Sequence, residues 1–481
     1  MDESENASIR PLSALMTRLF ENDLKNIEGN IEDATGKLVS YVSGINAQAQ
    51  VVVNELLEDI VNNMMQFGYP TAEELQLQAN TKISLKNEII NNTDLTYTSS
   101  DTNESLPSTH NGLGYKNLIK ISFLLQEFTK VIATRAQASI PLLFIEEPEA
   151  HMHPQLQSVF VKYIENVIKK MNGNRIQIIM STHSSHVANS VPFSKIRYMR
   201  RHKNYIACKN LEEYYSKASS IEKKKKDLDF LQKYMTLSRC DLYFCDKAIL
   251  IEGAAERLLL PDMINKCEKR GFFTEKSPAL SSQYCSLIEV GGAYAHRFFE
   301  MVDFLEIPTL ILTDIDFVDI HGKSCQKQCA DRTSNSTIIR WCHDVFDIPI
   351  SNSIKIDKVN ELAMDEQKRT NGLRHIEFQV EENSYHPRSL EESIINVNRK
   401  EFGLADDIEE ITFDDENEKK TNFAIRLLVE EEFDNYKIPL YIKNGLIWLN
   451  QQSKMPDTLI PKRKKKRRYT KKVEVVNSGK E

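Results

Sequence analysis

Acidic residues stand at the ends of apolar segments in the second half of the chain. Glu252 ends the segment "KAILIEG" and Glu256 follows one helical turn later, while Asp314 and Asp316 end "TLILTDID". Short apolar runs predict buried strands, and alternate residues of a strand face the same side, so we expect both aspartates to reach one ion. Oxygen-only ligands favour Mg²⁺ or Mn²⁺ over zinc. These residues therefore predict a divalent-metal site suited to phosphoryl chemistry.

A second group of polar residues follows apolar runs, or precedes a helix, in the first half of the chain. Glu146 and Glu147 end "LLFIEE", His183 follows the next run in "STHS", and Gly112 and Gly114 come just before a helical pattern. Strand ends of a parallel sheet open onto a ligand crevice, and a glycine-rich helix start favours anions. These residues are our candidate nucleotide-binding site, with Glu146 on Mg²⁺, Glu147 on a water and His183 on a γ-phosphate.

The loop that normally completes such a site is not in the sequence. A P-loop requires G-x-x-x-x-G-K-[ST], whose backbone amides and lysine hold the phosphates. The one GK[ST] here is Gly322-Lys323-Ser324, and Phe317 stands where the first glycine is needed. We therefore expect no ATP hydrolysis by this chain alone, and ATP binding only with a P-loop supplied elsewhere. Either the sequence is truncated, or another chain supplies the P-loop, or the lobe is now only structural; truncation or a split system is favoured over a self-contained ATPase.

Composition fits an ordinary globular protein without a membrane span. Of the 481 residues, 41% are hydrophobic and 27% charged, and no apolar run approaches the roughly 20 residues that cross a bilayer. Eight scattered cysteines suit reduced thiols, so we expect a cytoplasmic protein. Residues 461–472 hold nine Lys/Arg and no acid, so the remaining chain carries −7 − 9 = −16. This tail either contacts phosphates or only aids solubility.

The order of apolar segments predicts an α/β protein with two sheet-containing parts. Helical spacing dominates the first 67 residues, and strands and helices then alternate twice along the chain, which is typical of parallel sheets. We expect these segments: a helical arm (1–80), an ATPase-like lobe (81–205), a helical linker (206–239), a Rossmann-like domain (240–400), its helical C-terminal part (401–455) and a disordered basic tail (456–481).

Both parts resemble known families. Gly112 to Asn117 are similar to the signature loop of ABC/SMC-type ATPases, "LLFIEEPEAHMHP" to Walker B and the D-loop, and "STHS" to the switch histidine. The segments "KAILIEGAAE", "IEVGGAYAHRF" and "TLILTDID" resemble a TOPRIM domain. Together they are most similar to OLD-family (overcoming lysogenisation defect) nucleases, a group that includes Gabija-type antiphage nucleases. The fold implied is a partial ATPase lobe with a helical arm, followed by a TOPRIM domain.

The resemblance continues toward the C-terminus and nominates further residues. "HPRSLEESI" resembles the family's TLEE segment and nominates Glu391 and Glu392. "KKTNFAIRL" resembles its lysine motif and nominates Lys420 ahead of Lys419, and "IPLYIKNGLIWL" looks like its C-terminal signature. The lysine would offset negative charge on the phosphorane. The implied ligand sets are Glu252, Asp314 and Asp316 for one Mg²⁺, and Glu256 with Glu392 for a second; Lys420 completes the catalytic set.

The function implied is a DNA endonuclease or nickase that uses two metal ions. The resemblance also implies control by nucleotide, a homodimer or larger oligomer, and a role in defence against phage. Two alternatives stay open. One is a regulatory module without catalysis that docks a partner ATPase, and the other is a TOPRIM ribonuclease acting on RNA such as tRNA. Catalytic carboxylates touch phosphate oxygens only, so the sequence does not separate DNA from RNA.

Overall fold

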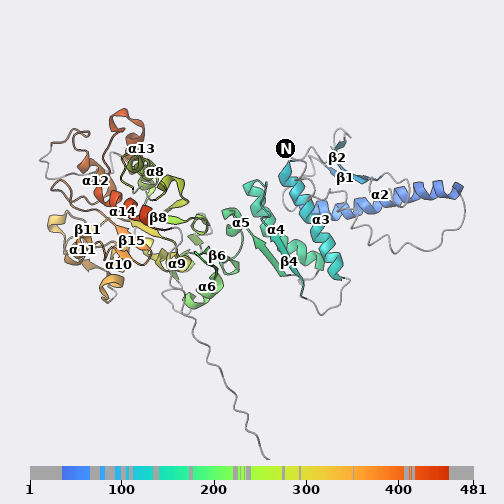
Figure 1. Cartoon of the computed structure of the whole chain (residues 1–481), viewed down its shortest axis with the longest axis horizontal. Coiled ribbons are helices and arrows are strands. Elements are labelled where there is room, and N and C mark those ends of the chain that lie inside the picture. The colour runs from blue at the N-terminus through green and yellow to red at the C-terminus, as the bar shows by residue number, and fades with distance from the viewer. Residues whose placement is uncertain are drawn as a thin grey trace, which may run out of the picture. The chain divides into compact units, whose positions relative to one another are not determined.

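The structure is a computed structural model of the whole chain (Figure 1). It forms two units: residues 1–196 with 210–245, and residues 197–209 with 246–481. Within the part that the structure describes, no helix is long and apolar enough to cross a bilayer. The described residues are 35–65, 76–81, 93–98, 105–107, 112–133, 140–172, 177–219, 226–227, 229–231, 233–234, 240–273, 277–291, 294–349, 351–405, 411, 413 and 418–453.

Two predicted segments lie partly or wholly outside these ranges. The basic tail (456–481) lies wholly outside, and so do the first 34 residues of the predicted helical arm. The rest of the arm contains a long helix, α2 (Thr35–Met65), on which Val53, Leu57 and Ile60 are buried. Their spacing of four and three residues places them on one face of the helix. The predicted domain boundaries stay predictions.

The first unit combines an antiparallel sheet with a short parallel one. Strands β1, β2 and β3 form the antiparallel sheet, and β4 pairs in parallel with β5. Helices α3 and α4 bury Leu118, Phe160 and Ile164 against the inner face of β4 and β5. The elements are β1 (Gln76–Thr81), β2 (Thr93–Thr98), β3 (Ser105–Pro107), α3 (Leu113–Ala133), β4 (Leu142–Glu146), α4 (Pro154–Asn172), β5 (Gln177–Ser181), α5 (Ser185–Asn189) and α6 (Leu211–Ser219).

The second unit is built on a five-stranded sheet in the order β14-β15-β10-β8-β9. Four of its strands run parallel, and β14 is antiparallel to β15. The three strands expected from apolar runs are β8 (Lys247–Ile251), β9 (Cys285–Glu289) and β10 (Thr309–Leu312). The other two are β14 (Thr370–Asn371) and β15 (Arg374–Glu377). The sheet order places β8 and β10 side by side near the centre.

Helices from far apart in the sequence cover one face of this sheet, as Figure 1 shows around β8. Ile249, Ile251 and Leu310 belong to one buried cluster with apolar residues of these helices. Packing is closest where a Cβ on Gly445 would lie 2.8 Å from Leu310 Cδ1. The covering helices are α8 (Ala254–Lys269), α12 (Leu390–Val397), α13 (Lys420–Val429) and α14 (Leu440–Gln451).

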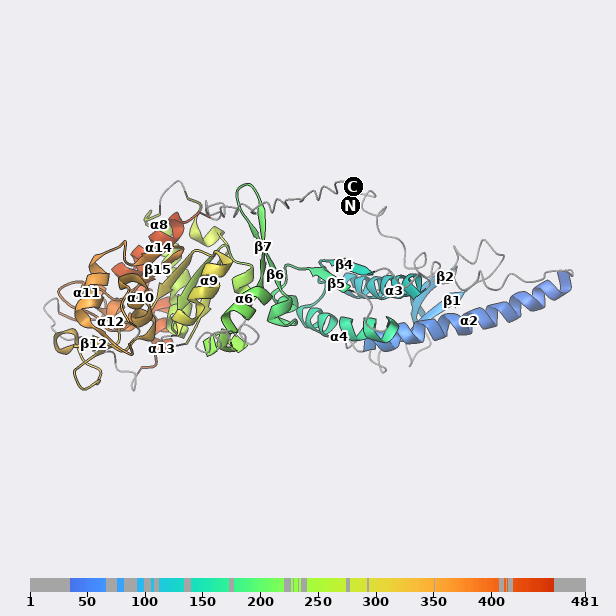
Figure 2. The same ribbon diagram turned by 90° about the horizontal axis from the view of Figure 1, so that it is seen from below.

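Smaller elements complete the second unit. A sheet of β11, β12 and β13 follows the central strand β10 in the chain, and β6 and β7 form a separate two-stranded ribbon (Figure 2). The remaining elements are β6 (Arg197–Arg201), β7 (Ile206–Asn210), α9 (Phe299–Leu305), β11 (Phe317–Val318), β12 (Arg332–Thr333), α10 (Ser336–Phe346), β13 (Ile354–Lys355) and α11 (Ile356–Met364).

Candidate active site

The acidic residues of the second unit meet at the carboxyl ends of β8 and β10. The two strands are parallel neighbours with Leu250 opposite Ile311, so the residues that follow them come together. Glu252 Oε1 accepts a short hydrogen bond from the Thr313 hydroxyl and another from the Asp314 backbone N–H at 3.2 Å. The sequence thus brings Glu252 and the Asp-x-Asp segment to one edge of the sheet.

The Asp-x-Asp segment is not part of a strand, and our geometric premise for it was wrong. Strand β10 ends at Leu312, so Asp314 and Asp316 lie in the loop that follows. Asp316 has a φ of 49°, a left-handed backbone conformation. Ile315 between them is buried, and its N–H donates to Gln379 Oε1 at 3.0 Å. The loop, not the alternation of a strand, therefore sets the directions of the two carboxylates.

Asn335 ties the two halves of the acidic group together, and sequence reasoning missed it. Its Nδ2 donates to Glu252 Oε1 at 3.2 Å, to Asp316 Oδ2 at 3.2 Å and to the Asp314 carbonyl at 2.8 Å. Its Oδ1 accepts from the N–H groups of Thr337 and Ile338, so the same side chain caps α10. The sequence "SNST" carries the N-cap signal, but nothing in it indicates contact with residues 83 positions away.

Gln379 was missed for the same reason. It follows β15, is fully buried, and donates from Nε2 to Asp314 Oδ1 at 2.5 Å. The pKa of Tyr441 on α14 lies well above its usual range because the phenol is buried and, next, because Asp314 and Glu256 repel its charged form. The buried Gln379 amide thus holds the Asp314 carboxylate and the Ile315 N–H together.

The carboxyl groups have raised pKa values. Burial is the largest cause for Glu252, and repulsion from Asp316 adds to it. Burial likewise raises the pKa of Glu256 to about 7, followed by repulsion from Glu391 and Glu252. The pKa of Asp314 is raised strongly by burial and then by Glu252 and Glu256, while burial raises that of Asp316 against hydrogen bonding from Asn335. The site holds more negative charge than its own surroundings neutralise.

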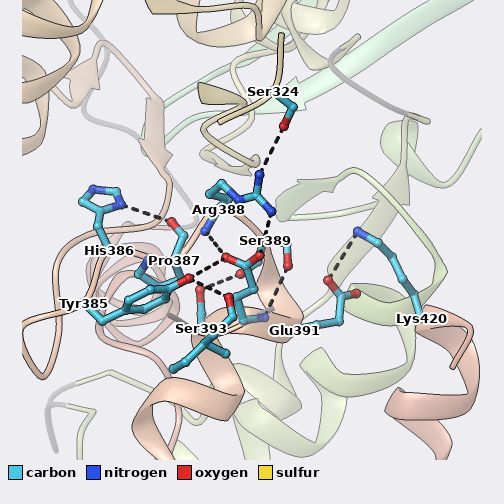
Figure 3. Close-up of polar contacts among 11 residues, drawn as sticks. Ser324, Tyr385, His386, Pro387, Arg388, Ser389, Glu391, Ser393 and Lys420 are labelled. Carbon is cyan, nitrogen blue, oxygen red and sulfur yellow. Dashed lines mark hydrogen bonds and ion pairs between the residues drawn. The ribbon is translucent and has the colours of Figure 1, made fainter. Parts of the chain in front are cut away.

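Lys420 is the cation that acts on the pKa values of these carboxyl groups. It lowers the pKa values of Glu256, Asp314 and Asp316. Its Nζ lies 3.3 Å from Glu391 Oε2, an ion pair drawn at the right of Figure 3. The side chain of Glu391 is 1% exposed and that of Lys420 is 46% exposed, so the ammonium stands at the open side of the site.

The structure places Glu391 at the acidic group, whereas we expected Glu392 there. Glu392 lies in a separate network with Arg388 and Tyr385, two residues labelled in Figure 3. Its Oε1 accepts from Arg388 Nη2 at 3.1 Å, and its Oε2 accepts from the Arg388 N–H at 2.9 Å and the Tyr385 hydroxyl at 3.3 Å. Neighbours on a helix point about 100° apart because a turn takes 3.6 residues, so only one of the two glutamates can face the site.

The donor chemistry of the site fits a hard divalent cation. Every candidate ligand is a carboxylate, the ligand type that Mg²⁺ and Mn²⁺ prefer, and a cation would relieve the repulsion among the buried charges. In the described residues, no group of three His, Cys, Asp or Glu side chains is arranged to hold a metal ion as it stands. Glu252 accepts from Thr313 through Oε1 and Asp314 accepts from Gln379 through Oδ1, so each carboxylate has a second oxygen that could bind a metal ion.

The candidate nucleotide residues of the first unit meet at the ends of β4 and β5. Glu147 Oε1 lies 3.3 Å from His183 Nε2, with side chains that are 57% and 83% exposed. Glu146 is the last residue of β4 and is exposed. Glu149, which we had not singled out, accepts from the Thr182 hydroxyl at 2.7 Å and from the His183 N–H at 2.8 Å. It fixes the loop that carries the histidine.

The two glycines differ in what surrounds them. A Cβ on Gly114 would lie 2.4 Å from the His151 carbonyl oxygen, so glycine allows α3 to approach the loop after β4. Asn117 joins the same two segments by donating to the Ala150 carbonyl at 3.3 Å. A Cβ on Gly112 would meet nothing within 4 Å. Packing explains Gly114 without a ligand, and a phosphate contact by either glycine stays a prediction.

Comparison with known families agrees with this two-part organisation. Residues 2–188 match the family model of the AAA ATPase domain, and residues 243–316 match that of the overcoming lysogenization defect protein-like TOPRIM domain. The second match contains Glu252, Glu256, Asp314 and Asp316. A solved SMC ATPase structure is 15% identical with a TM-score of 0.23 over 36% of this chain and 97% of its own, too low to carry an argument.

Three curated nucleases are similar in sequence. Endonuclease GajA of Bacillus cereus (strain HuB5-5) is 28% identical over 477 residues, 90% of this chain and 64% of its own. The Old nuclease of Escherichia phage P2 is 23% identical over 64% of this chain and 49% of its own. The OLD nuclease of Thermus scotoductus (strain ATCC 700910 / SA-01) is 27% identical over 37% of this chain and 31% of its own. The chain thus spans less than two thirds of each relative.

The relatives and the two matched domains give the same assignment. The chain is homologous to GajA and the OLD nucleases, and it joins an AAA ATPase-type region to an OLD-like TOPRIM domain.

Proposed function

We propose that this chain is a metal-dependent endonuclease that hydrolyses phosphodiester bonds of DNA. The observation that carries the proposal is the group of buried carboxylates at the ends of β8 and β10, whose pKa values are raised by burial and mutual repulsion. Such a group costs stability unless cations or protons neutralise it, which is expected of a functional site. The names of the relatives, which are nucleases, support the same reaction.

The proposed roles follow the positions of the side chains. Asn335 and Gln379 would hold the ligands in place. Bound Mg²⁺ would supply a Lewis acid that lowers the pKa of a water and stabilises the leaving oxygen. Lys420, partly exposed beside the acids, would offset charge on the attacked phosphate as a mobile point charge. The proposed ligands are Glu252, Asp314 and Asp316 for one ion and Glu256 with Glu391 for another, Glu391 taking the place first assigned to Glu392.

Nucleotide control is the second part of the proposal. Glu147 and His183 lie together at the strand ends of the first unit, where ligands of parallel sheets bind, and the AAA ATPase match covers this region. Since the sequence contains no G-x-x-x-x-G-K-[ST], bound ATP would need a P-loop from another source. We propose that nucleotide binding regulates cleavage, within an oligomer that acts in defence against phage.

The test is cleavage of supercoiled plasmid by purified protein with Mg²⁺ or Mn²⁺, beside Asp314→Ala. We expect nicking or linearisation that the substitution lowers by at least about 100-fold, the scale for losing one charge-stabilising group in an active site. Asp344→Ala is the matched control, because Asp344 pairs with Arg340 on α10, about 13 Å of helix beyond Asn335. Cleavage that survives Asp314→Ala unchanged would remove the proposed site, and cleavage of RNA alone would move the assignment to a ribonuclease.

A further inference from the structure

The ribbon of β6 and β7 stands out by its charge. Residues 197–209, "RYMRRHKNYIACK", hold five Lys/Arg and no acid in a chain of net charge −7. They belong to the second unit, with the acidic site, although unit-one residues flank them in sequence. The candidate active site leaves this ribbon unexplained.

One face of the ribbon is anchored to the second unit. Glu306, which ends α9 with a φ of 59°, contacts three side chains of the ribbon. Its carbonyl accepts from Arg200 Nη2 at 3.0 Å, its Oε1 lies 2.5 Å from Lys209 Nζ, and its Oε2 lies 3.2 Å from His202 Nε2. The His202 side chain is 4% exposed. This contact fixes the ribbon on a single acidic residue.

The tip of the ribbon is a tight turn. The His202 N–H donates to the Tyr205 carbonyl at 2.8 Å, and the two rings stack with centroids 4.4 Å apart. Lys203 and Asn204 occupy the turn and are exposed. A turn that is closed by a backbone bond and a ring stack loses little freedom when a ligand binds.

The other face of the ribbon is open and carries cations. Arg197, Met199 and Arg201 alternate along β6 with Tyr198 and the anchored Arg200 and are exposed, Met199 by 62%. Alternate residues share a face of a strand, so these three form one row. Ile206, 63% exposed, and Cys208 extend that open face on β7. With a rise of about 3.3 Å per residue, Arg197 and Arg201 stand about 13 Å apart.

We propose that this ribbon binds the backbone and groove of duplex DNA. A two-stranded ribbon fits the major groove, and cations about 13 Å apart match a few nucleotides at 3.4 Å per step of one strand. Met199 and Ile206 lie where an apolar contact with sugars or thymine methyl groups is available. The ribbon holds five Lys/Arg and no acid, a one-sided charge that complements the phosphates of a nucleic acid. That this ribbon delivers DNA for cleavage rests on the proposed function, whereas DNA binding by the ribbon does not.

The test is binding of a fluorescein-labelled 30-base-pair duplex in EDTA at several salt concentrations. The variant is Arg197→Glu with Arg201→Glu, and the control is Lys269→Glu with Lys355→Glu, the same charge change at exposed residues of the second unit. Lys269 ends α8, about 24 Å of helix from Gly253 beside the acids. We expect the ribbon variant to bind at least about 10-fold more weakly. Its salt slope, the steepness of log affinity against log salt concentration, should fall by about 2, as for two lost phosphate contacts.

Labelling of Cys208 gives an independent readout. This thiol is exposed on the ribbon, so bound duplex should slow its reaction with a maleimide, followed by peptide mapping. Slower reaction at Cys208 with unchanged reaction at exposed Cys329 supports the proposal. Equal protection of both thiols, or none, would overturn it, as would a wild-type salt slope in the ribbon variant. An Arg197→Gln/Arg201→Gln variant repeats the test if the charge reversal fails to fold.

The outcomes separate this inference from the proposed function. If wild-type protein binds duplex through the ribbon but cuts nothing with Mg²⁺ or Mn²⁺, the ribbon stands and the nuclease falls. If plasmid is cut and the ribbon variant keeps its KM and its affinity, the nuclease stands and the ribbon falls. With both correct, the ribbon variant raises KM at least about 10-fold with little change in kcat, because it removes binding shared by ground and transition states.

Discussion

The two units use the same sequence pattern, an apolar run that ends in acid, with different results. In the first unit, β4 alternates exposed and half-buried residues, and Phe144 is 64% exposed. In the second unit every residue of β8 and β10 is buried, with Leu310 at 0%. The acids that follow differ accordingly: the Glu147 side chain is 57% exposed, whereas burial raises the pKa of Asp314 strongly.

The difference comes from the neighbours of each strand. In the described residues, β4 pairs with β5 and its inner face packs on α3 and α4, while the other face shows Leu142, Phe144 and Ile179. Strands β8 and β10 have partners on both sides and a helical layer above them. Parallel sheets are normally covered on both faces. A strand-end acid therefore becomes strongly desolvated only where the surrounding sheet is complete.

The largest effect on folding that tests this contrast is truncation of one apolar strand residue in each unit. Leu310→Ala should lower the free energy of unfolding by about 2–5 kcal/mol, the range for a fully buried leucine. Phe144→Ala should cost less than about 1 kcal/mol because most of its ring is already exposed. Both tryptophans, Trp341 and Trp448, lie in the second unit, so tryptophan fluorescence during denaturation follows that unit.

The contrast between the buried and the exposed sheet would be contradicted if Leu310→Ala and Phe144→Ala lowered the free energy of unfolding equally. Far-UV circular dichroism on the same samples includes the first unit and so detects any loss there. A large cost for Phe144→Ala would show that the apolar face of β4 and β5 is covered in solution. An unchanged fluorescence midpoint for Leu310→Ala would contradict the buried centre of the second sheet.

The sequence predicted the strands whose side chains are apolar and missed one whose side chains are paired. Strand β15 reads Arg-His-Ile-Glu and yet is buried throughout. Its polar side chains have partners: Arg374 pairs with Asp303 at 2.9 Å, and His375 lies 3.0 Å from Glu377. Such a strand has no apolar run, so its burial follows only from tertiary contacts that sequence spacing does not reveal.

The same limit applies to the site. Residues that follow strongly apolar strands, such as Glu252 and Asp314, could be assigned to one edge from the sequence because strand ends of a parallel sheet meet there. Asn335 and Gln379 reach that edge only through the way α10 and β15 pack. The choice between Glu391 and Glu392 depends on the rotation of α12, which one sequence does not fix.

An intermediate effect is expected from adding one methyl group at a close approach in each unit. Gly445→Ala would place a Cβ 2.8 Å from Leu310 Cδ1, and Gly114→Ala would place one 2.4 Å from the His151 carbonyl oxygen. Overpacking of this kind costs about 1–3 kcal/mol. Gly445→Ala should lower the fluorescence midpoint, because Trp448 lies on the same helix, whereas Gly114→Ala should act on the circular dichroism alone.

A double-mutant cycle sharpens this prediction. Leu310→Ala removes the methyl group that the new Cβ at position 445 would meet, so the two substitutions should be less costly together than their sum. No such rescue is available at Gly114, where the obstacle is backbone. Strict additivity of the changes at Gly445 and Leu310 would argue against the close approach of α14 to β10.

The last effect is the pH dependence that the buried acids give the metal-free second unit. Burial raises the pKa of Glu256 from 4.5 to about 7, so the folded protein holds this proton more tightly than the unfolded chain does. The stability that the protonated Glu256 contributes is therefore complete below about pH 4.5 and is lost as the pH rises through about 7. In EDTA, Glu256→Gln should raise the fluorescence midpoint at pH 8 and leave it nearly unchanged at pH 4.5. Mg²⁺ should stabilise wild-type protein at pH 8 far more than at pH 4.5.

Glu381→Gln provides the control of opposite sign. This exposed carboxylate pairs with Lys327 at 3.0 Å, and that hydrogen bond lowers its pKa. Its ionised form therefore adds a little stability at pH values above the ordinary pKa of a glutamate. Its loss should lower the midpoint slightly at pH 8 and leave the response to Mg²⁺ intact. If Glu256→Gln and Glu381→Gln shifted the midpoint in the same direction at pH 8, burial would not be what separates the acids at the ends of β8 and β10 from those at the surface.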